Sequence, residues 1–329
     1  METEILEVVA GPMGQRAIAR AAALLQAGRL VAFPTETVYG LGALALEAAA
    51  VSRIFVAKGR PATNPLIVHV PDRARAREVV ASWDDRADAL ADAFWPGPLT
   101  LILPKDERVP AAVTAGLDAV AVRVPSHPIA RALLEEVGAP VAAPSANRYT
   151  RISPTTARHV EKSLGGRIEA ILDGGATPIG IESTVVDLCG EVPLLLRPGA
   201  VSIDELREVV GEVEFHAATA AEGEARPSPG LARRHYAPAG QVELVHSGEL
   251  AAKLEDGGAT GVIARQRRPE VAEVRAWLQL PDDAKGFARQ LYAALHALED
   301  AGATRILIEE APAGADWDGV RDRLSRAGG

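Results

Sequence analysis

Cationic side chains recur in the glycine- and proline-rich turns of this sequence. Lys58 and Arg60 stand two residues apart in the turn Lys58-Gly59-Arg60-Pro61, and Arg123 ends an apolar run just before Pro125. A lysine and an arginine so spaced in an extended turn can both face one anion, and an arginine at a strand end suits a carboxylate. Scattered surface arginines are the alternative interpretation. The pattern as a whole favours a concave site for a small anionic ligand.

Hydroxyls, carboxylates and amides occupy further turns that follow apolar runs. The segment Phe33–Gly42 (Phe-Pro-Thr-Glu-Thr-Val-Tyr-Gly-Leu-Gly) leaves the run 30–33, Ala143–Asn147 leaves another run, and Glu182-Ser183-Thr184 follows a glycine turn. Polar groups just past strand ends, with glycines that allow close backbone approach, are how α/β proteins build ligand sites. Each turn alone fits an ordinary connection, but the set predicts the walls of one cavity.

Several familiar kinds of site are excluded. No G-x-x-x-x-G-K-[ST] is present, so the chain is not a P-loop nucleotide binder. No G-x-G-x-x-G opens a helix and Ser145 lacks the G-x-S-x-G elbow, which argues against a dinucleotide fold and a serine hydrolase. The single cysteine, Cys189, can form neither an internal disulfide nor a thiolate cluster, and no two histidines have metal-ligand spacing. We therefore expect no metal site in the protein.

The elements that must position these turns alternate between helix and strand. Apolar periodicity, capping residues and Gly/Pro punctuation predict helices over 15–27, 47–57, 76–94, 128–137 and 203–210. Short apolar runs predict strands at 30–33, 65–70, 99–103, 120–124, 141–143, 170–172, 184–188 and 194–196. This mixture indicates an α/β fold, with an open, twisted, mixed sheet and helices packed on it.

The length of 329 residues suggests two domains. We predict a catalytic domain over 1–211, a linker over 212–238 and a small C-terminal α/β domain over 239–329. In the last, strands are expected at 242–245, 261–264 and 305–308, and helices at 284–300 and 317–326. The linker holds Arg233-Arg234-His235-Tyr236. It could fold back as a lid over a phosphate-bearing ligand, although a solvated charge run is the simpler interpretation.

The N-terminal residues give no secretion signal, because acidic side chains stand where a basic and then apolar stretch would be needed. No apolar run approaches the roughly 20 residues that cross a membrane. We therefore expect a cytoplasmic protein with no membrane partner.

Taken in order, the turn motifs resemble those of the YrdC-type family, and more closely its two-domain threonylcarbamoyl-AMP synthase branch. The resemblance is dense over about 15–200 and thinner after 240. Any single motif is weak, whereas the ordered set is specific. The motifs are Phe33–Gly42, Lys58-Gly59-Arg60, Asn64-Pro65-Leu66, Trp95–Thr100, Arg123-Val124-Pro125, Ala143–Asn147, Ser153-Pro154-Thr155, Asp173-Gly174-Gly175, Glu182–Asp187, Leu196–Gly199 and His235–Pro238.

The resemblance implies a YrdC-like fold around a large cationic cavity, and a nucleotidyltransferase activity. L-threonine, bicarbonate and ATP would give L-threonylcarbamoyl-AMP and pyrophosphate, with Mg²⁺ accompanying ATP and no organic cofactor. The product would pass to a tRNA threonylcarbamoyl transferase system for threonylcarbamoyladenosine modification of tRNA. The chain itself would not bind tRNA tightly.

Site residues carry over by motif position. The resemblance implies a catalytic tetrad of Lys58, Arg60, Ser145 and Asn147. L-threonine would meet Thr35, His69, Arg123, the Ala143 backbone and Ser183. ATP would meet Lys58, Arg60, Asn64, Thr114, Ser145, Ser153, Arg197 and Tyr236.

The implied mechanism is mainly positional. A carbamate formed from threonine and bicarbonate would attack the α-phosphorus of ATP, so Lys58 and Arg60 would offset the repulsion between two anions. The sequence offers no evident general base. One alternative is a double-stranded RNA or tRNA-binding module, which the net charge of −9 disfavours. A carbamoyl-transfer enzyme of hydrogenase maturation is excluded, since those chains carry cysteine-rich zinc motifs.

Overall fold

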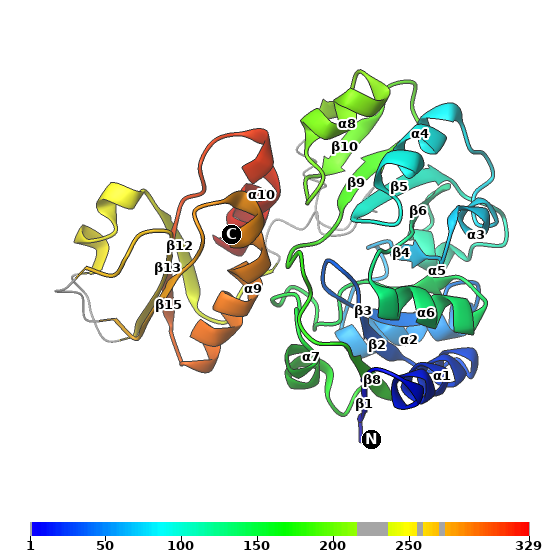
Figure 1. Cartoon of the computed structure of the whole chain (residues 1–329), viewed down its shortest axis with the longest axis horizontal. Helices are drawn as coiled ribbons and strands as arrows, with labels where there is room; N and C mark the ends of the chain where they lie inside the picture. Colours follow the sequence, from blue (N-terminus) through cyan, green and yellow to red (C-terminus); the bar gives the residue numbers. More distant parts are fainter. Residues whose placement is uncertain (1, 216–235, 255–258, 270–273, 329) are drawn as a thin grey trace.

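A computed structural model describes residues 2–215, 236–254, 259–269 and 274–328. Figure 1 shows two bodies, a larger one with an 11-stranded sheet and a smaller one with a four-stranded sheet. In spatial order the larger sheet contains β1 (Glu4–Glu7), β8 (Ala170–Asp173), β2 (Val31–Pro34), β3 (Tyr39–Leu44), β7 (Val141–Ala142), β4 (Ile67–His69), β6 (Ala119–Arg123), β5 (Leu99–Pro104), β9 (Thr184–Asp187), β10 (Leu194–Arg197) and β11 (Glu214–Phe215).

The larger sheet is mixed, because β2 pairs with β3 in antiparallel register while β4 pairs with β6 and β5 with β9 in parallel register. Helices cover both of its faces. These helices are α1 (Pro12–Gln26), α2 (Ala48–Lys58), α3 (Arg73–Arg77), α4 (Asp85–Phe94), α5 (Ala111–Thr114), α6 (Pro128–Val137), α7 (Ala157–Leu164) and α8 (Ile203–Val210). The predicted twisted mixed α/β sheet is thereby confirmed.

The alternation of side chains along β2 explains how one strand serves two cores. Val31 and Phe33 pack with α1 and α6 in one apolar cluster. Ala32, between them, points to the opposite face and joins the cluster formed with α2, α4 and α7. Since successive residues of a strand face opposite sides, an uninterrupted apolar run is what a strand buried on both faces requires.

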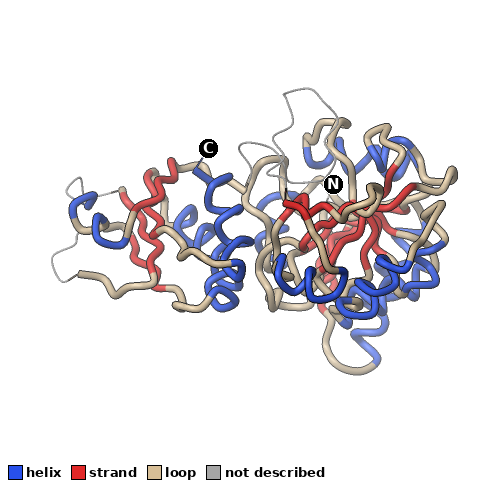
Figure 2. The backbone as a smooth tube through the Cα atoms, turned by 90° about the horizontal axis from the view of Figure 1, so that it is seen from above, coloured by secondary structure: helices blue, strands red, loops and turns tan. Residues whose placement is uncertain are grey.

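The smaller domain has a parallel sheet with helices on the side of the larger domain. Its strands, in spatial order, are β12 (Gln241–Val245), β15 (Arg305–Glu309), β13 (Thr260–Ala264) and β14 (Ala276–Gln279). Figures 1 and 2 show α9 (Ala284–Asp300) and α10 (Asp318–Gly328) between this sheet and the larger domain. Short 3₁₀ helices lie at Ser247–Glu249, Ala252–Leu254 and Ala315–Trp317.

The two domains share one apolar cluster. Val38, Ile152 and Ile181 of the larger domain pack in the same cluster as Phe287 and Leu291 of α9. Polar contacts flank this cluster, among them the ion pair at 2.6 Å between Arg151 and Glu299. The smaller domain is therefore docked through its helices, and its sheet faces away from the larger domain.

Two predicted elements differ in the structure. The expected helix over 76–94 is two helices, α3 and α4, because Asp84 caps a new helix by accepting from the Ala87 backbone N–H at 2.9 Å. Between them Val80 forms a β-bridge with Lys105. The expected turn after Phe33 also contains a strand, because 39–44 form β3 and fold back on β2 as a hairpin.

The predicted linker over 212–238 is only partly described. Glu214 and Phe215 form β11 beside β10, and Tyr236 and Ala237 lie against the larger domain, where Ala237 bridges Arg151. Residues 216–235, which include most of the proposed lid, lie outside the described residues. The domain boundaries and the lid stay predictions. Among the described residues, no helix combines the length and apolar character needed to cross a membrane.

Candidate functional site

One cavity gathers the polar turns of the larger domain. The β2–β3 hairpin and the turn after β7 form one wall, because the Leu41 backbone N–H donates to the Pro144 carbonyl at 2.7 Å and Gly40 bridges Ser145. The ends of β4 and β6 and the segment before β9 form the others. Predicted site residues on the cavity wall are Thr35, Arg60, His69, Arg123, Ala143, Ser145, Ser183, Arg197 and Tyr236.

Arg123 lies on the cavity wall and is held rigidly. Its Nε donates to the Gly97 carbonyl at 3.1 Å, Nη1 donates to Thr37 Oγ1 at 3.0 Å, and Nη2 lies 2.8 Å from a Glu36 carboxylate oxygen. Burial raises the pKa of Glu36, but the charge and hydrogen bonds of Arg123 outweigh it and keep that pKa below its ordinary value. The guanidinium is therefore fixed in place, as recognition of a carboxylate requires.

His69 is a neutral hydrogen-bonding group. Burial, together with the charge of Arg123, lowers the pKa of His69 to about 3. Its Nδ1 lies 3.2 Å from the Ile67 carbonyl. Since a carbonyl only accepts, Nδ1 carries the proton and Nε2 keeps its lone pair. His69 can thus accept a hydrogen bond from a ligand hydroxyl or amine in the cavity.

Thr35 is fixed within the β2–β3 hairpin. Its hydroxyl donates to the Val38 carbonyl at 2.7 Å and lies 2.8 Å from the Thr37 hydroxyl, which in turn accepts from Arg123. These bonds orient the hydroxyls of the hairpin toward Arg123. Thr35, His69 and Arg123 therefore form one polar end of the cavity.

Three members of the predicted tetrad, Lys58, Ser145 and Asn147, meet through the backbone. Lys58 is only 2% exposed, and its ammonium donates to the carbonyls of Ser145 and Asn147. Burial, with a contribution from the charge of Arg60, lowers the pKa of Lys58 well below its ordinary value. A lysine in a glycine- and proline-rich turn is usually solvated, but Lys58 is buried because it ends α2 and donates to the 145–147 loop. Arg60 donates through Nη2 to the Pro65 carbonyl at 3.0 Å.

Five predicted residues do not line this cavity. Lys58 faces a neighbouring cavity, which Arg148 and Arg151 also line. The Asn147 amide braces its own loop by donating to the Arg148 and Arg151 carbonyls. Asn64 donates to the Tyr149 hydroxyl at 3.1 Å, Thr114 is buried, and the Ser153 hydroxyl donates to Glu182. The assignment of these residues to ATP or catalysis stays a prediction.

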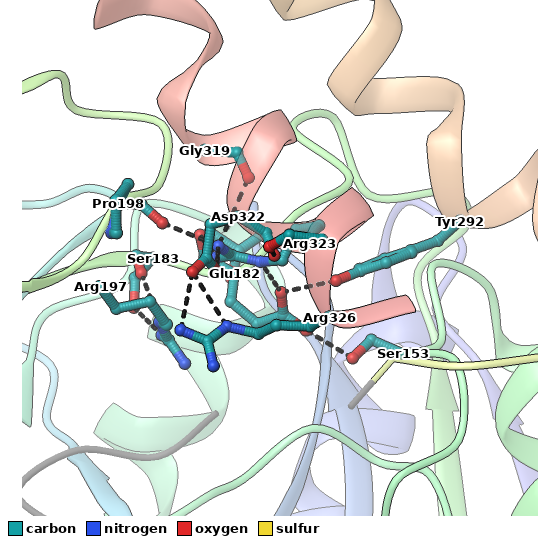
Figure 3. Close-up of polar contacts among 12 residues, drawn as sticks. Ser153, Glu182, Ser183, Arg197, Pro198, Tyr292, Gly319, Asp322, Arg323 and Arg326 are labelled. Atoms are coloured by element: carbon teal, nitrogen blue, oxygen red, sulfur yellow. Dashed lines mark hydrogen bonds and ion pairs between the residues drawn. The ribbon is translucent and has the colours of Figure 1, made fainter. Parts of the chain in front are cut away.

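A polar cluster missed by sequence reasoning lies where the cavity meets the smaller domain (Figure 3). Glu182, on the cavity wall, accepts from Arg323 Nε at 2.8 Å and from the Tyr292 hydroxyl at 2.9 Å. Close by, Arg197 donates to the Ser183 carbonyl and hydroxyl, each at 3.0 Å. The turn Glu182-Ser183-Thr184 was a visible signal, but nothing in it identifies a partner 141 residues away.

The fold and the cavity define an α/β enzyme domain for small anionic substrates, with a second domain packed behind the wall that holds Glu182. Comparison with known proteins identifies the family. A model for Sua5, YciO and YrdC proteins, described as telomere recombination, matches residues 23–199. A model described as threonylcarbamoyl-AMP synthase, C-terminal domain, matches residues 201–329. The chain belongs to the threonylcarbamoyl-AMP synthase family.

Individual relatives resemble the whole chain. A threonylcarbamoyl-AMP synthase of Pyrococcus abyssi is 45% identical, with 94% of this chain and 93% of the relative covered. A threonylcarbamoyl-AMP synthase of Bacillus subtilis is 40% identical, with 95% and 93% covered. The crystal structure of P. abyssi Sua5 complexed with L-threonine is similar with a TM-score of 0.92 and 43% identity, covering 99% of this chain and 98% of that one.

Proposed function

We propose that this protein makes L-threonylcarbamoyl-AMP and pyrophosphate from L-threonine, bicarbonate and ATP. The observation that carries the proposal is a single cavity lined by a rigid arginine, a neutral histidine, hydroxyls and further cations. These side chains could bind an amino acid and a polyanion next to each other. The names of the relatives and the threonine-bound P. abyssi structure support the same activity.

In this proposal the Arg123 end of the cavity binds L-threonine. The guanidinium would bind the threonine carboxylate. Its partners already hold it in place, so little reorganisation is needed on binding. His69 Nε2 would accept from the threonine hydroxyl or amine, and Ser183 would complete the polar wall. Because His69 is neutral, its Nε2 can accept that hydrogen bond, while the nearby positive charge of Arg123 favours the unprotonated form of the amine.

The nucleotide would occupy the end formed by Arg60, Ser145, Arg197 and Tyr236. The carbamate oxygen would form a bond to the α-phosphorus of ATP while the bond to the pyrophosphate oxygen breaks. Arg60 and Arg197 would stabilise the charge on the phosphorus centre, where two anions meet in a water-poor site. We propose that Mg²⁺ enters with ATP on its phosphate oxygens, since Mg²⁺ favours such ligands. Lys58 would hold the 145–147 loop against the nucleotide.

The alternative of a double-stranded RNA or tRNA-binding module has less support. The cavity cations Arg60, Arg123 and Arg197 are all buried. A duplex backbone contacts exposed cations on a surface, whereas these side chains can meet only a ligand that enters the cavity. We propose that the product passes to a tRNA threonylcarbamoyl transferase system in the cytoplasm, where ATP and tRNA are found.

The deciding experiment follows pyrophosphate in a mixture of the protein, ATP, Mg²⁺, bicarbonate and threonine. Release should require both threonine and bicarbonate, and an adenylate carrying both should appear by mass spectrometry. Pyrophosphate release that is indifferent to threonine would refute the proposal. A steep loss of tRNA affinity with added salt, without any synthase activity, would favour the RNA-binding alternative.

A further inference from the structure

Glu182 poses an electrostatic problem for the proposed reaction. The carboxylate is 6% exposed and lines the same cavity as Arg123, Arg197 and Tyr236. The proposed substrates bring a carboxylate, a carbamate and phosphates into that cavity. A buried carboxylate among such ligands repels them strongly, because the low dielectric of the interior screens little. Some group must therefore offset the charge of Glu182.

The offsetting group comes from the smaller domain. Arg323 on α10 is 1% exposed and crosses into the larger domain. Its Nε donates to the Glu182 carboxylate at 2.8 Å, Nη2 to the Glu182 carbonyl at 3.2 Å, and Nη1 to the Pro198 carbonyl at 2.8 Å. The guanidinium thus holds both the side chain and the backbone of Glu182, directly beside Ser183.

Arg323 also contacts the predicted nucleotide end. Its Cζ lies 5.4 Å from the centre of the Tyr236 ring, and the Tyr292 ring centre lies 5.8 Å from that of Tyr236. Arg323 is itself supported from behind by Asp322, which it contacts at 2.7 Å and which pairs with Arg326 at 2.8 Å. One side chain of the smaller domain therefore touches both Glu182 and Tyr236 in the cavity wall.

Packing alone does not account for this arginine. Val320 and Leu324 of α10 already anchor the helix in the apolar cluster that the domains share. Burying a guanidinium is costly unless it meets a carboxylate and acceptors in good geometry, and an apolar side chain at such a site is often as stable. An arginine at this position is explained by the charge that it faces.

We propose that Arg323 is a positioning residue for the synthase reaction, which neutralises Glu182 on the cavity wall and keeps its carboxylate from pairing with Arg197. The inference rests on the proposed function and assigns the smaller domain a part in it. Without Arg323, Glu182 would present an uncompensated negative charge to the cavity. Arg197 also acts on the Glu182 charge, and it would then be drawn from Ser183.

The test compares full-length variants in the pyrophosphate assay. Arg323→Met keeps the volume and removes the charge, and kcat/KM for ATP should fall on the order of 100-fold, as for loss of one electrostatic group in an active site. Adding Glu182→Gln to Arg323→Met should raise kcat/KM for ATP again by at least about tenfold, because no uncompensated charge remains. Arg323→Lys, which keeps the charge, should retain more activity than Arg323→Met. Circular dichroism and melting curves would establish that each variant is folded.

Arg321→Ala is the matched control. Arg321 lies on the same helix, but its Nη1 donates to the Pro312 carbonyl within the smaller domain and its Nη2 pairs with Asp318 there. Its loss should leave kcat/KM unchanged. The activity of Arg323→Met relative to that of the wild-type protein should also rise as the pH is lowered, since protonation of Glu182 removes the unpaired charge. A purely structural role for Arg323 predicts neither this pH dependence nor rescue by Glu182→Gln.

Wild-type kcat/KM in folded Arg323→Met, or a folded double variant no more active than the single one, would overturn the inference. If Arg323→Met does not fold, Glu182→Gln is compared with Glu182→Gln/Arg323→Met. The kcat/KM values of these two variants should agree within about threefold, because Arg323 then has no charge to offset. A kcat/KM about tenfold or more lower in the double variant would overturn the inference. Failure of the wild-type protein to release pyrophosphate would instead refute the proposed function itself.

Discussion

His69 and Arg123 are register partners in the parallel strands β4 and β6. Cα partners in a sheet project their side chains from the same face, so the imidazole and the guanidinium stand side by side. Burial, together with the cation next to it, keeps the imidazole neutral. This pairing places a guanidinium beside a neutral acceptor, instead of two positive charges side by side.

The neutral state of His69 makes a prediction about stability and pH. The pKa of His69 is about 3 in the folded protein, against 6.5 as its ordinary value. Between these values the unfolded chain binds a proton that the folded chain does not, so the free energy of unfolding falls as the pH drops below 6.5. His69→Gln should reduce this slope by at most about 1.4 kcal/mol per pH unit.

Denaturant titrations at pH 7, 6 and 5 would measure the slope for the two proteins. His246→Gln is a suitable control because His246 is exposed. An unchanged slope in His69→Gln would mean that His69 titrates normally in the folded protein.

Lys58→Met should lose stability as well as activity. The buried ammonium donates to the carbonyls of Ser145 and Asn147, and leaving these acceptors unsatisfied should cost about 1–3 kcal/mol of unfolding free energy. Turnover should fall further, since Ser145 lines the substrate cavity. Chemical denaturation and pyrophosphate release would measure the two effects. Near-normal turnover in Lys58→Met would mean that Arg60, and not Lys58, offsets the repulsion between the anionic substrates.

Gly199→Ala should distort the cavity wall. A Cβ atom at Gly199 would lie 2.4 Å from the Thr184 backbone nitrogen and 2.7 Å from the Glu182 carbonyl oxygen, which no flexible side chain can relieve. We expect a lower melting temperature and a clear loss of kcat/KM. Gly190→Ala is the matched control, because the nearest atom to its Cβ would be 3.7 Å away. Equal behaviour of the two variants would mean that the 182–184 backbone can move without harm.

Amino-acid selectivity tests whether the Thr35, His69 and Arg123 end reads the threonine hydroxyl. Valine should be rejected strongly, since polar groups that pair with the hydroxyl would be left unpaired. Serine lacks only a methyl group and should be disfavoured by about 1–3 kcal/mol in kcat/KM. Competition assays with each amino acid would give these ratios. Equal use of valine and threonine would contradict a role for His69 as hydroxyl acceptor.

Local signals explain which elements were predictable. Helix α8 begins where expected because Ser202 and Glu205 form a capping box, and α6 because Pro128 opens it and Gly138 ends it in the left-handed conformation. The helix expected over 76–94 failed because apolar periodicity continues across the break at 78–84, whereas the cap at Asp84 begins a new helix. Capping residues were the stronger signal there.

The site was predictable in part for the same reason. Turns that follow strand ends, such as Thr35 and Ala143, converge because the strands share a sheet. The contact between Glu182 and Arg323 was out of reach, since it depends on how two domains dock. Burial of Lys58 was also unpredictable from its glycine-flanked turn, because the covering loop comes from residues 145–147.

The apolar cluster common to Ile181, Ile152 and helix α9 has a consequence for how the chain melts. Two domains joined only by a tether unfold in separate heat-capacity peaks. Here the unfolding of one domain exposes the apolar surface that the other domain contributes to the cluster. Loss of either domain therefore destabilises the other. Calorimetry should therefore record a single cooperative transition, with a van't Hoff enthalpy close to the calorimetric one.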